Sequence, residues 1–346
     1  MSKLLISLAI VLAVILVALL GFKLFDYIRA YEFYNHSEVA FATPGVNDSN
    51  FVPQGMDYVE KDNVFIFTGY MSDSTASRVY VRHENEDGTS RLTYTKLVYG
   101  DGREYNEHTG GIECSGDYVL ITDTTGIFIF SYQDILAGKE TTPVIYEAPL
   151  HVDPAHCFIY SKDGKDYLLA GSFYYEGDYE TPAHERITTP GGEVNPSIIL
   201  IYPINAEATK ASELIAAEPI AAISTPQKVQ GMCFTDDGRM VFSTSWGLTS
   251  SEILFYDEAK IEASKVENYQ LNGVTKKGAE FNFTLDLYFA DSSTYVDKVV
   301  APPMSEELVY LDGKIVVFCE SACNKYIFGK ITTGFNVYAL KYLELK

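Results

Sequence analysis

The sequence predicts an all-β fold: a β-propeller of five blades, preceded by one transmembrane helix. Two observations lead to this prediction. A short unit of two β-rich runs around a polar turn recurs five times, and the first residues form one continuous apolar stretch. The chain has 346 residues, which one large all-β domain can accommodate. Six blades are the alternative, if residues 257–303 contain a degenerate repeat.

The apolar stretch covers residues 4–22 and reads LLISLAIVLAVILVALLGF. At ~1.5 Å per residue it spans about the ~30 Å hydrocarbon core of a bilayer. A cleavable signal peptide has a shorter apolar region and then an A-x-A-like site, whereas here Lys23, Asp26 and Arg29 follow directly. We therefore expect an uncleaved signal anchor, with a removed signal peptide as the alternative. Residues 1–30 form this anchor with a short linker, and residues 31–346 form the propeller domain.

The orientation of the anchor does not follow from its flanking charges, because Lys3 and the terminal amine face Lys23 and Arg29 on the other side. The rest of the chain contains no second apolar run of spanning length, and strands follow the anchor at once. An N-terminal anchor is the usual way to export such a domain. We expect a single-pass protein of the cell membrane whose bulk is extracytoplasmic.

The formal net charge of −21 argues against binding to nucleic acid. A duplex backbone would repel this surface, and the chain has no cluster of Lys or Arg that could release counterions. The same charge disfavours anionic lipid head groups. Its simplest role is to keep an exported surface soluble.

The repeated unit is an apolar strand, a polar turn and a second apolar strand. Residues such as Asp, Gly, Asn and Lys at 162–165, 236–239 and 312–314 mark these turns as hairpins. One or two further strands follow each hairpin, as residues 252–257 and 283–289 do after the fourth unit, and four strands make one blade of a propeller. The five units begin at Val52, His108, Pro154, Val229 and Met304.

The last unit has a single later strand before the chain ends, at residues 335–345. The segment EVAFATP, which starts at Glu38, precedes the first unit and can complete that blade. Strands from both ends of the chain would then close the ring and remove an exposed sheet edge. Outside the anchor we expect one surface helix, near residues 206–217.

Two rings of side chains should converge on one mouth of the central channel. The first strand of each blade lines the channel, and its start lies at the same face as the end of the second strand. The first ring is Gln54, Gly110 with His108 beside it, His156, Gln230 and Glu306. The second ring is Tyr70, Asp123, Phe173 with Tyr174, Trp246 and Glu320.

These residue types suit either a bound ion or a small ligand. Imidazole with carboxylate suits Zn²⁺, and carboxylate with amide oxygen suits Ca²⁺, so His156 and Glu306 are candidate ligands of a divalent metal. The alternative is that the polar side chains only hydrogen-bond one another and ordered water. A long insertion at residues 176–196 should fall on the same mouth, where His184, Glu185 and Arg186 are further candidate contacts.

Cys319 and Cys323 lie four residues apart. Outside the cell they could close a small loop through a disulfide, and the spacing leaves both the bridge and two free thiols open.

Units with a QGM or HTGGI opening and an Asp-Gly turn resemble those of extracytoplasmic bacterial propellers related to the TolB-like and regucalcin/gluconolactonase superfamilies. The resemblance runs from Glu38 to the end of the chain and concerns architecture and turn pattern. It implies a divalent metal at the channel mouth, held by carboxylate and asparagine side chains of several inner strands. Glu306 is the one carboxylate at a matching register, while Gln54 and Gln230 stand where stronger ligands are expected.

Three functions remain open. The first is a binding module that recognises a small molecule, a glycan or a partner protein at the mouth. The second is a metal-dependent hydrolase or lactonase, in which Glu306 and His156 hold an ion and His108 or Asp123 moves the proton. The third is a structural scaffold of an envelope assembly. The sequence contains no G-x-S-x-G, Walker-type or H-E-x-x-H motif, and we favour the binding module.

Overall fold

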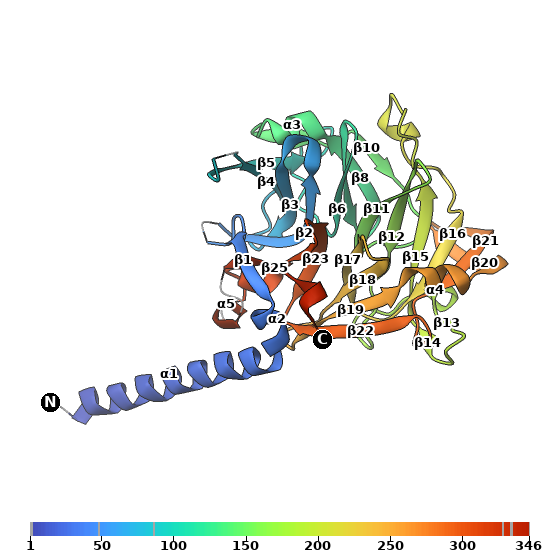
Figure 1. Cartoon of the computed structure of the whole chain (residues 1–346). Helices are drawn as coiled ribbons and strands as arrows, with labels where there is room; N and C mark the ends of the chain where they lie inside the picture. The colour runs from blue at the N-terminus through green and yellow to red at the C-terminus, as the bar shows by residue number, and fades with distance from the viewer. Residues whose placement is uncertain (1–2, 48, 86, 327–328, 333–334, 346) are drawn as a thin grey trace.

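The computed structural model describes residues 3–47, 49–85, 87–326, 329–332 and 335–345, and it confirms a propeller of five blades (Figure 1). Each blade is a twisted sheet of mostly antiparallel strands whose first strand lies at the central channel. Blade 1 holds β2 (Phe51–Val59), β3 (Val64–Met71), β4 (Arg78–Glu84), β5 (Ser90–Val98) and β9 (Thr141–Pro143). Blade 2 holds β6 (Ile112–Ser115), β7 (Tyr118–Asp123), β8 (Gly126–Ser131) and β10 (Tyr146–Ala148).

The remaining blades follow in chain order around the channel. Blade 3 holds β11 (His156–Lys162), β12 (Lys165–Gly171), β15 (Ser197–Pro203), β16 (Ala221–Thr225), β21 (Ala279–Phe289) and β20 (Val266–Lys276). Blade 4 holds β17 (Val229–Thr235), β18 (Arg239–Thr244), β19 (Ser251–Asp257) and β22 (Tyr295–Ala301). Blade 5 holds β23 (Ser305–Leu311), β24 (Lys314–Cys319), β25 (Asn336–Leu340) and β1 (Ser37–Ala42). A separate short pair, β13 (Ile187–Thr188) and β14 (Val194–Asn195), lies in the insertion.

Both ends of the chain close blade 5, as predicted. β1 pairs antiparallel with β25, with Ser37 opposite Leu340 and Val39 opposite Tyr338. The fourth strand of the last blade therefore comes from the start of the propeller domain, so that unfolding blade 5 must break contacts of both chain ends.

The stretch 257–303 forms no sixth blade. β22 is the outer strand of blade 4, and β20 and β21 form a hairpin that extends blade 3, with β21 parallel to β16. Assigning residues 283–289 to blade 4 is therefore wrong. The alternating apolar side chains of β21, such as Phe283 and Leu287, pack into the core between blades 2 and 3. Alternation identified the strand, but it could not identify the sheet edge that it joins.

The predicted surface helix at residues 206–217 is wrong as well. This segment contains only a single 3-10 turn, η3 (Ala211–Glu213). The chain folds back on itself through a bridge between Ile204 and Ile215, which buries Leu214 in the core of blade 3. The short helices of the described residues are α2 (Tyr31–Asn35), α3 (Tyr132–Leu136), α4 (Glu258–Ala263) and α5 (Gly329–Thr332).

Neighbouring inner strands approach one another so closely that only glycine fits at the contacts. A Cβ atom on Gly55 would lie 2.5 Å from the carbonyl oxygen of Gly110, and one on Gly110 would lie 2.1 Å from that of Ala155. On the far side of the ring, a Cβ on Gly231 would lie 2.5 Å from the Cα of Glu307. The five inner strands therefore touch backbone to backbone around a narrow channel.

Buried carboxylates below the mouth bond these inner strands together. Asp57 on β2 accepts a hydrogen bond of 3.0 Å from the backbone N–H of Cys114 on β6. Glu307 on β23 accepts one of 2.9 Å from the N–H of Met232 on β17. Burial raises the pKa of Asp57 to about 6 and that of Glu307 well above its ordinary value. The channel is therefore acidic as well as narrow.

The apolar segment forms α1 (Lys3–Arg29), a single helix that projects away from the propeller beside α2 and α5 (Figure 1). An 18-residue stretch within Leu5–Arg29 has a mean hydropathy of 3.1, and this helix could cross a membrane by length and composition. The root of the helix is fixed to the propeller. The hydroxyl of Tyr34 donates to Asp26 at 2.9 Å and to the carbonyl of Thr332 in α5 at 3.2 Å, and Phe33 is fully buried.

Gly55→Ala should lower the thermal unfolding midpoint of the full chain in detergent by at least about 3 °C. Overpacking typically costs ~1–3 kcal/mol, and in large domains ~1 kcal/mol corresponds to ~2–4 °C. Gly100→Ala is the matched control, because its added Cβ meets nothing closer than the Val144 carbonyl oxygen at 3.7 Å. Equal midpoints for the two variants would contradict the close contact of inner strands.

Candidate functional site

A cavity of about 680 Å³ opens at the mouth of the channel where the inner strands begin. Its size lies within the ~300–1,000 Å³ of sites for small ligands. The structure places ten of the twelve ring residues along it, from all five blades. They are Gln54, Tyr70, His108, Gly110, Asp123, Phe173, Gln230, Trp246, Glu306 and Glu320.

The two exceptions, His156 and Tyr174, both belong to blade 3. Ala155 lines the cavity in place of His156, whereas of the neighbours Phe173 and Tyr174, both named in the second ring, only Phe173 lines it. Because successive side chains of a strand point to opposite faces, an error of one residue turns a side chain from the cavity into the sheet. The repeat aligns the strands well, but it does not fix where blade 3 begins to the residue.

His156 is fully buried and packs against Gly171, where an added Cβ would lie 2.3 Å from the ring Nε2. Both ring nitrogens lack a hydrogen-bond partner in the described structure, and burial lowers the pKa of the ring to about 3. The ring is therefore neutral. Tyr174 lies outside the cavity beneath the guanidinium of Arg186, 5.4 Å from its ring centre.

One wall of the cavity is acidic. Glu306 is only 3% exposed, and burial, together with the charges of Glu320 and Glu307, raises its pKa well above the ordinary value. Burial also raises the pKa of Glu320 to about 7, and the charge of Lys325 opposes that shift. Two carboxyl groups at this wall thus hold their protons to higher pH than they would in water.

A cationic and aromatic group stands beside Glu320. The ammonium of Lys325 lies 4.9 Å from the ring centre of Tyr70 and donates to its hydroxyl, which in turn donates weakly to Glu320 at 3.4 Å. His108 packs on Tyr70 with ring centres 4.4 Å apart. Burial and the charge of Lys325 lower the pKa of His108, so this ring contributes no positive charge near neutral pH.

The wall next to the insertion is aromatic. Trp246 stacks on Tyr175 with ring centres 4.5 Å apart and an interplanar angle of 26°. Tyr179 meets Trp246 edge-on at 5.2 Å, and Phe173 lies 5.9 Å away. Tyr179 is 53% exposed, so this cluster presents a partly open apolar face to the cavity.

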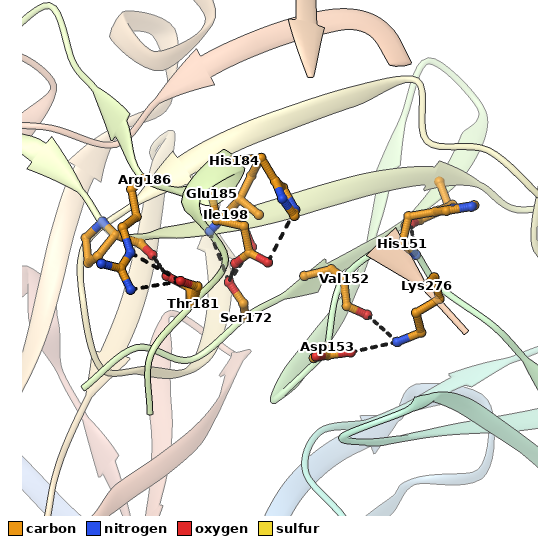
Figure 2. A network of polar contacts seen from close by, with 12 residues as sticks. His151, Val152, Asp153, Ser172, Thr181, His184, Glu185, Arg186, Ile198 and Lys276 are labelled. Carbon is orange, nitrogen blue, oxygen red and sulfur yellow. Dashed lines mark hydrogen bonds and ion pairs between the residues drawn. The ribbon is translucent and has the colours of Figure 1, made fainter. Parts of the chain in front are cut away.

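The insertion at residues 176–196 is held over the mouth by its own charged residues. Figure 2 shows Glu185 facing Ser172 and His184, while Arg186 turns towards Thr181. Of the three candidate contacts on this loop, only Glu185 lines the cavity. Burial raises its pKa to about 7. His184 and Arg186 thus contact other residues of the loop and do not line the cavity.

The added hairpin of blade 3 supports the rim of the cavity. Lys276 on β20 forms an ion pair of 2.7 Å with Asp153 and donates to the carbonyl of Val152 at 3.3 Å (Figure 2). Asp153 lines the cavity. The hairpin that the sequence assigned to another blade therefore positions a carboxylate of the site.

Sequence reasoning missed several cavity residues that follow strands rather than belong to them. Lys325 and Tyr326 come after the second strand of blade 5, and Asp153 comes before the first strand of blade 3. Their only sequence signal is proximity to a ring position, and this signal identifies no particular residue.

The residues at the mouth do not fit a bound divalent ion. His156 does not line the cavity that Glu306 faces, and nowhere in the described ranges are three or more His, Cys, Asp or Glu side chains arranged to hold a metal. The divalent metal stays a prediction of the sequence.

Cys319 and Cys323 are free thiols in this structure. Cys319 ends β24 opposite Ser305, whereas Cys323 packs against Val46 and Val52. Of the two alternatives that the spacing leaves open, the structure has the two free thiols.

The chain matches no protein-family profile and no curated sequence. Among solved structures it is similar to the PQQ-bound aldose sugar dehydrogenase of Streptomyces coelicolor, at 13% identity and a TM-score of 0.38, over 81% of this chain and 77% of that one. It is also similar to BamB from Moraxella catarrhalis, at 8% identity and a TM-score of 0.31, over 83% and 84%. Both are β-propellers, so the likeness concerns the fold alone. Membership of the TolB-like or regucalcin superfamilies stays a prediction.

Replacing Glu320 by Gln should flatten the pH dependence of stability. A carboxyl whose pKa is raised by folding stabilises the folded state below its unfolded pKa, and this stability is lost as the pH rises through the folded value of about 7. The thermal unfolding midpoint of the native chain should therefore decrease as the pH is raised from about 5 to about 8. The decrease should be smaller in Glu320→Gln.

The measurement is thermal unfolding of the full chain across this pH range, with Glu207→Gln on an exposed loop as the control. The same slope in the native chain and in Glu320→Gln would mean that Glu320 titrates as it would in water.

Proposed function

We propose that this chain is a membrane-attached binding protein that takes a sugar-like ring ligand at the mouth of its propeller. The observation that carries the proposal is the pairing of two unlike walls in one cavity. Trp246 and its neighbouring rings form an apolar face, and amide and carboxyl groups line the same cavity.

A sugar ring matches this arrangement chemically. Its C–H face is apolar and flat enough to cover an aromatic ring, and its hydroxyl groups both donate and accept hydrogen bonds. Gln54 and Gln230 offer amides at the start of two inner strands, and the protonated carboxyl groups of Glu306 and Glu320 can also donate. The combination gives orientation as well as affinity.

Attachment through α1 supports a role at a membrane surface. We infer that α1 crosses the membrane once and that the propeller lies on the extracytoplasmic side, where glycans and sugars are available. The acidic surface agrees with an exported domain and offers nothing to nucleic acid.

The single tryptophan of the chain allows a direct test, because Trp246 lies in the cavity wall. A panel of neutral and charged oligosaccharides would be titrated into the full chain in detergent, with tryptophan excited where tyrosine does not absorb. We expect a saturable change of emission with at least one sugar class. No change across the whole panel would overturn the proposal.

Trp246→Ala should weaken the binding of such an oligosaccharide by about tenfold to a hundredfold. Removing a central aromatic side chain typically costs ~1.5–3 kcal/mol, and ~1.4 kcal/mol corresponds to tenfold. Calorimetry would give the affinity, since the variant lacks the fluorophore. Tyr295→Ala, a partly exposed ring outside the cavity, is the matched control and should bind like the native chain.

A further inference from the structure

The cavity is strongly acidic. Lys325 is the only Lys or Arg among the described residues that line it. The carboxyl side chains that line it are Asp123, Asp153, Glu180, Glu185, Glu306 and Glu320. Such an excess of carboxyl groups around one enclosed volume favours positive charge in a ligand.

Most of these carboxyl groups already have partners within the protein. Asp123 accepts from Thr125 and Tyr105, Asp153 pairs with Lys276, Glu180 with Arg186, Glu185 accepts from Ser172, and Glu320 from Tyr70. These groups are therefore parts of the wall. Because they already accept hydrogen bonds or form ion pairs within the protein, they have little acceptor capacity left for a ligand.

Glu306 is the exception. It is 3% exposed, it lines the cavity, and it forms no hydrogen bond or ion pair with any residue that the structure describes. Burying a carboxyl group without a partner is costly. Its neighbours around the ring, Gln54 and Gln230, are uncharged. The cavity thus contains one buried, unpartnered acid and an aromatic wall.

We propose that the cavity binds an amino sugar, whose ammonium group pairs with Glu306 while its ring lies against Trp246. This inference rests on the function proposed above and names its ligand class. An ammonium group has three donors and can reach Glu306 together with amide or carboxyl oxygens beside it. Among the described residues, no three or more His, Cys, Asp or Glu side chains are grouped as a metal ion would need.

The protonation of Glu306 gives the proposal a signature. Burial raises the pKa of this carboxyl, so it carries a proton while the cavity holds no cation. An arriving ammonium favours the carboxylate, and the proton then leaves to solvent. Binding of the amino sugar should therefore release a proton, and its affinity should rise with pH as long as the amine stays charged.

The experiment is calorimetry of the full chain with two matched oligosaccharides, a glucosamine oligomer and the same oligomer fully N-acetylated, which has no charge. We expect the glucosamine oligomer to bind at least about tenfold more tightly, because a charge-assisted hydrogen bond contributes ~1.5–3 kcal/mol. Repeating the titration in two buffers of different ionisation enthalpy measures the released proton.

Three variants complete the design. In Glu306→Gln the preference for the amine should fall to within about twofold, and the proton release should fall to what Glu320, whose pKa is about 7, can contribute. Trp246→Ala keeps the net charge of the chain and should weaken both oligomers, which separates cavity binding from attraction of a polycation to an acidic protein. Glu207→Gln, on an exposed loop, should behave like the native chain.

Equal affinity of the native chain for both oligomers would overturn the amino-sugar inference and leave the binding function intact, and this comparison needs no variant to fold. A preference for the amine that survives Glu306→Gln would overturn it as well. If neither oligomer binds and the Trp246 emission stays unchanged across the wider sugar panel, the proposed function itself is overturned.

Discussion

The structure depends on the close approach of five inner strands around one axis. With so few blades the strands meet backbone to backbone, so Gly55, Gly110 and Gly231 stand at positions where any side chain would collide. Carboxylates such as Asp57 and Glu307 accept backbone N–H groups of the neighbouring strand and lock the spacing. Because the inner strands leave only a narrow channel, the open space is the cavity at its mouth, which we call the cup.

The cup is completed by segments outside the repeat. The inner strands bring Gln54, Gln230 and Glu306 to its floor, while the insertion of blade 3 and the chain after β24 build its walls. This division separates two roles. The repeat fixes distances between polar groups across the axis, and the loops set which apolar and charged surfaces face them.

The architecture was predictable because a propeller repeats its pattern, and closure by β1 and β25 followed from the missing strand of the last unit. The site was predictable to the same depth: ten of the twelve ring residues lie along the cavity, and only at His156 did the register slip by one residue, so that Ala155 lines the cavity instead. The course of the β20–β21 hairpin depended on an open sheet edge, which only tertiary packing reveals. Local pattern alone also could not decide against a helix near Leu214, which tertiary burial turned into a loop.

The end of α1 is hydrogen-bonded directly to the propeller. Tyr34 is hydrogen-bonded to both Asp26 and Thr332. Thr332 follows Lys325, which lines the cup, in the part of the chain between β24 and β25. If α1 is embedded in a bilayer, the cup is held at one height and one tilt above it, unlike a domain that swings on a flexible tether. Such a protein would encounter only ligands in a thin layer next to the membrane. Lateral diffusion of its anchor, rather than motion of the domain, would bring these ligands within reach.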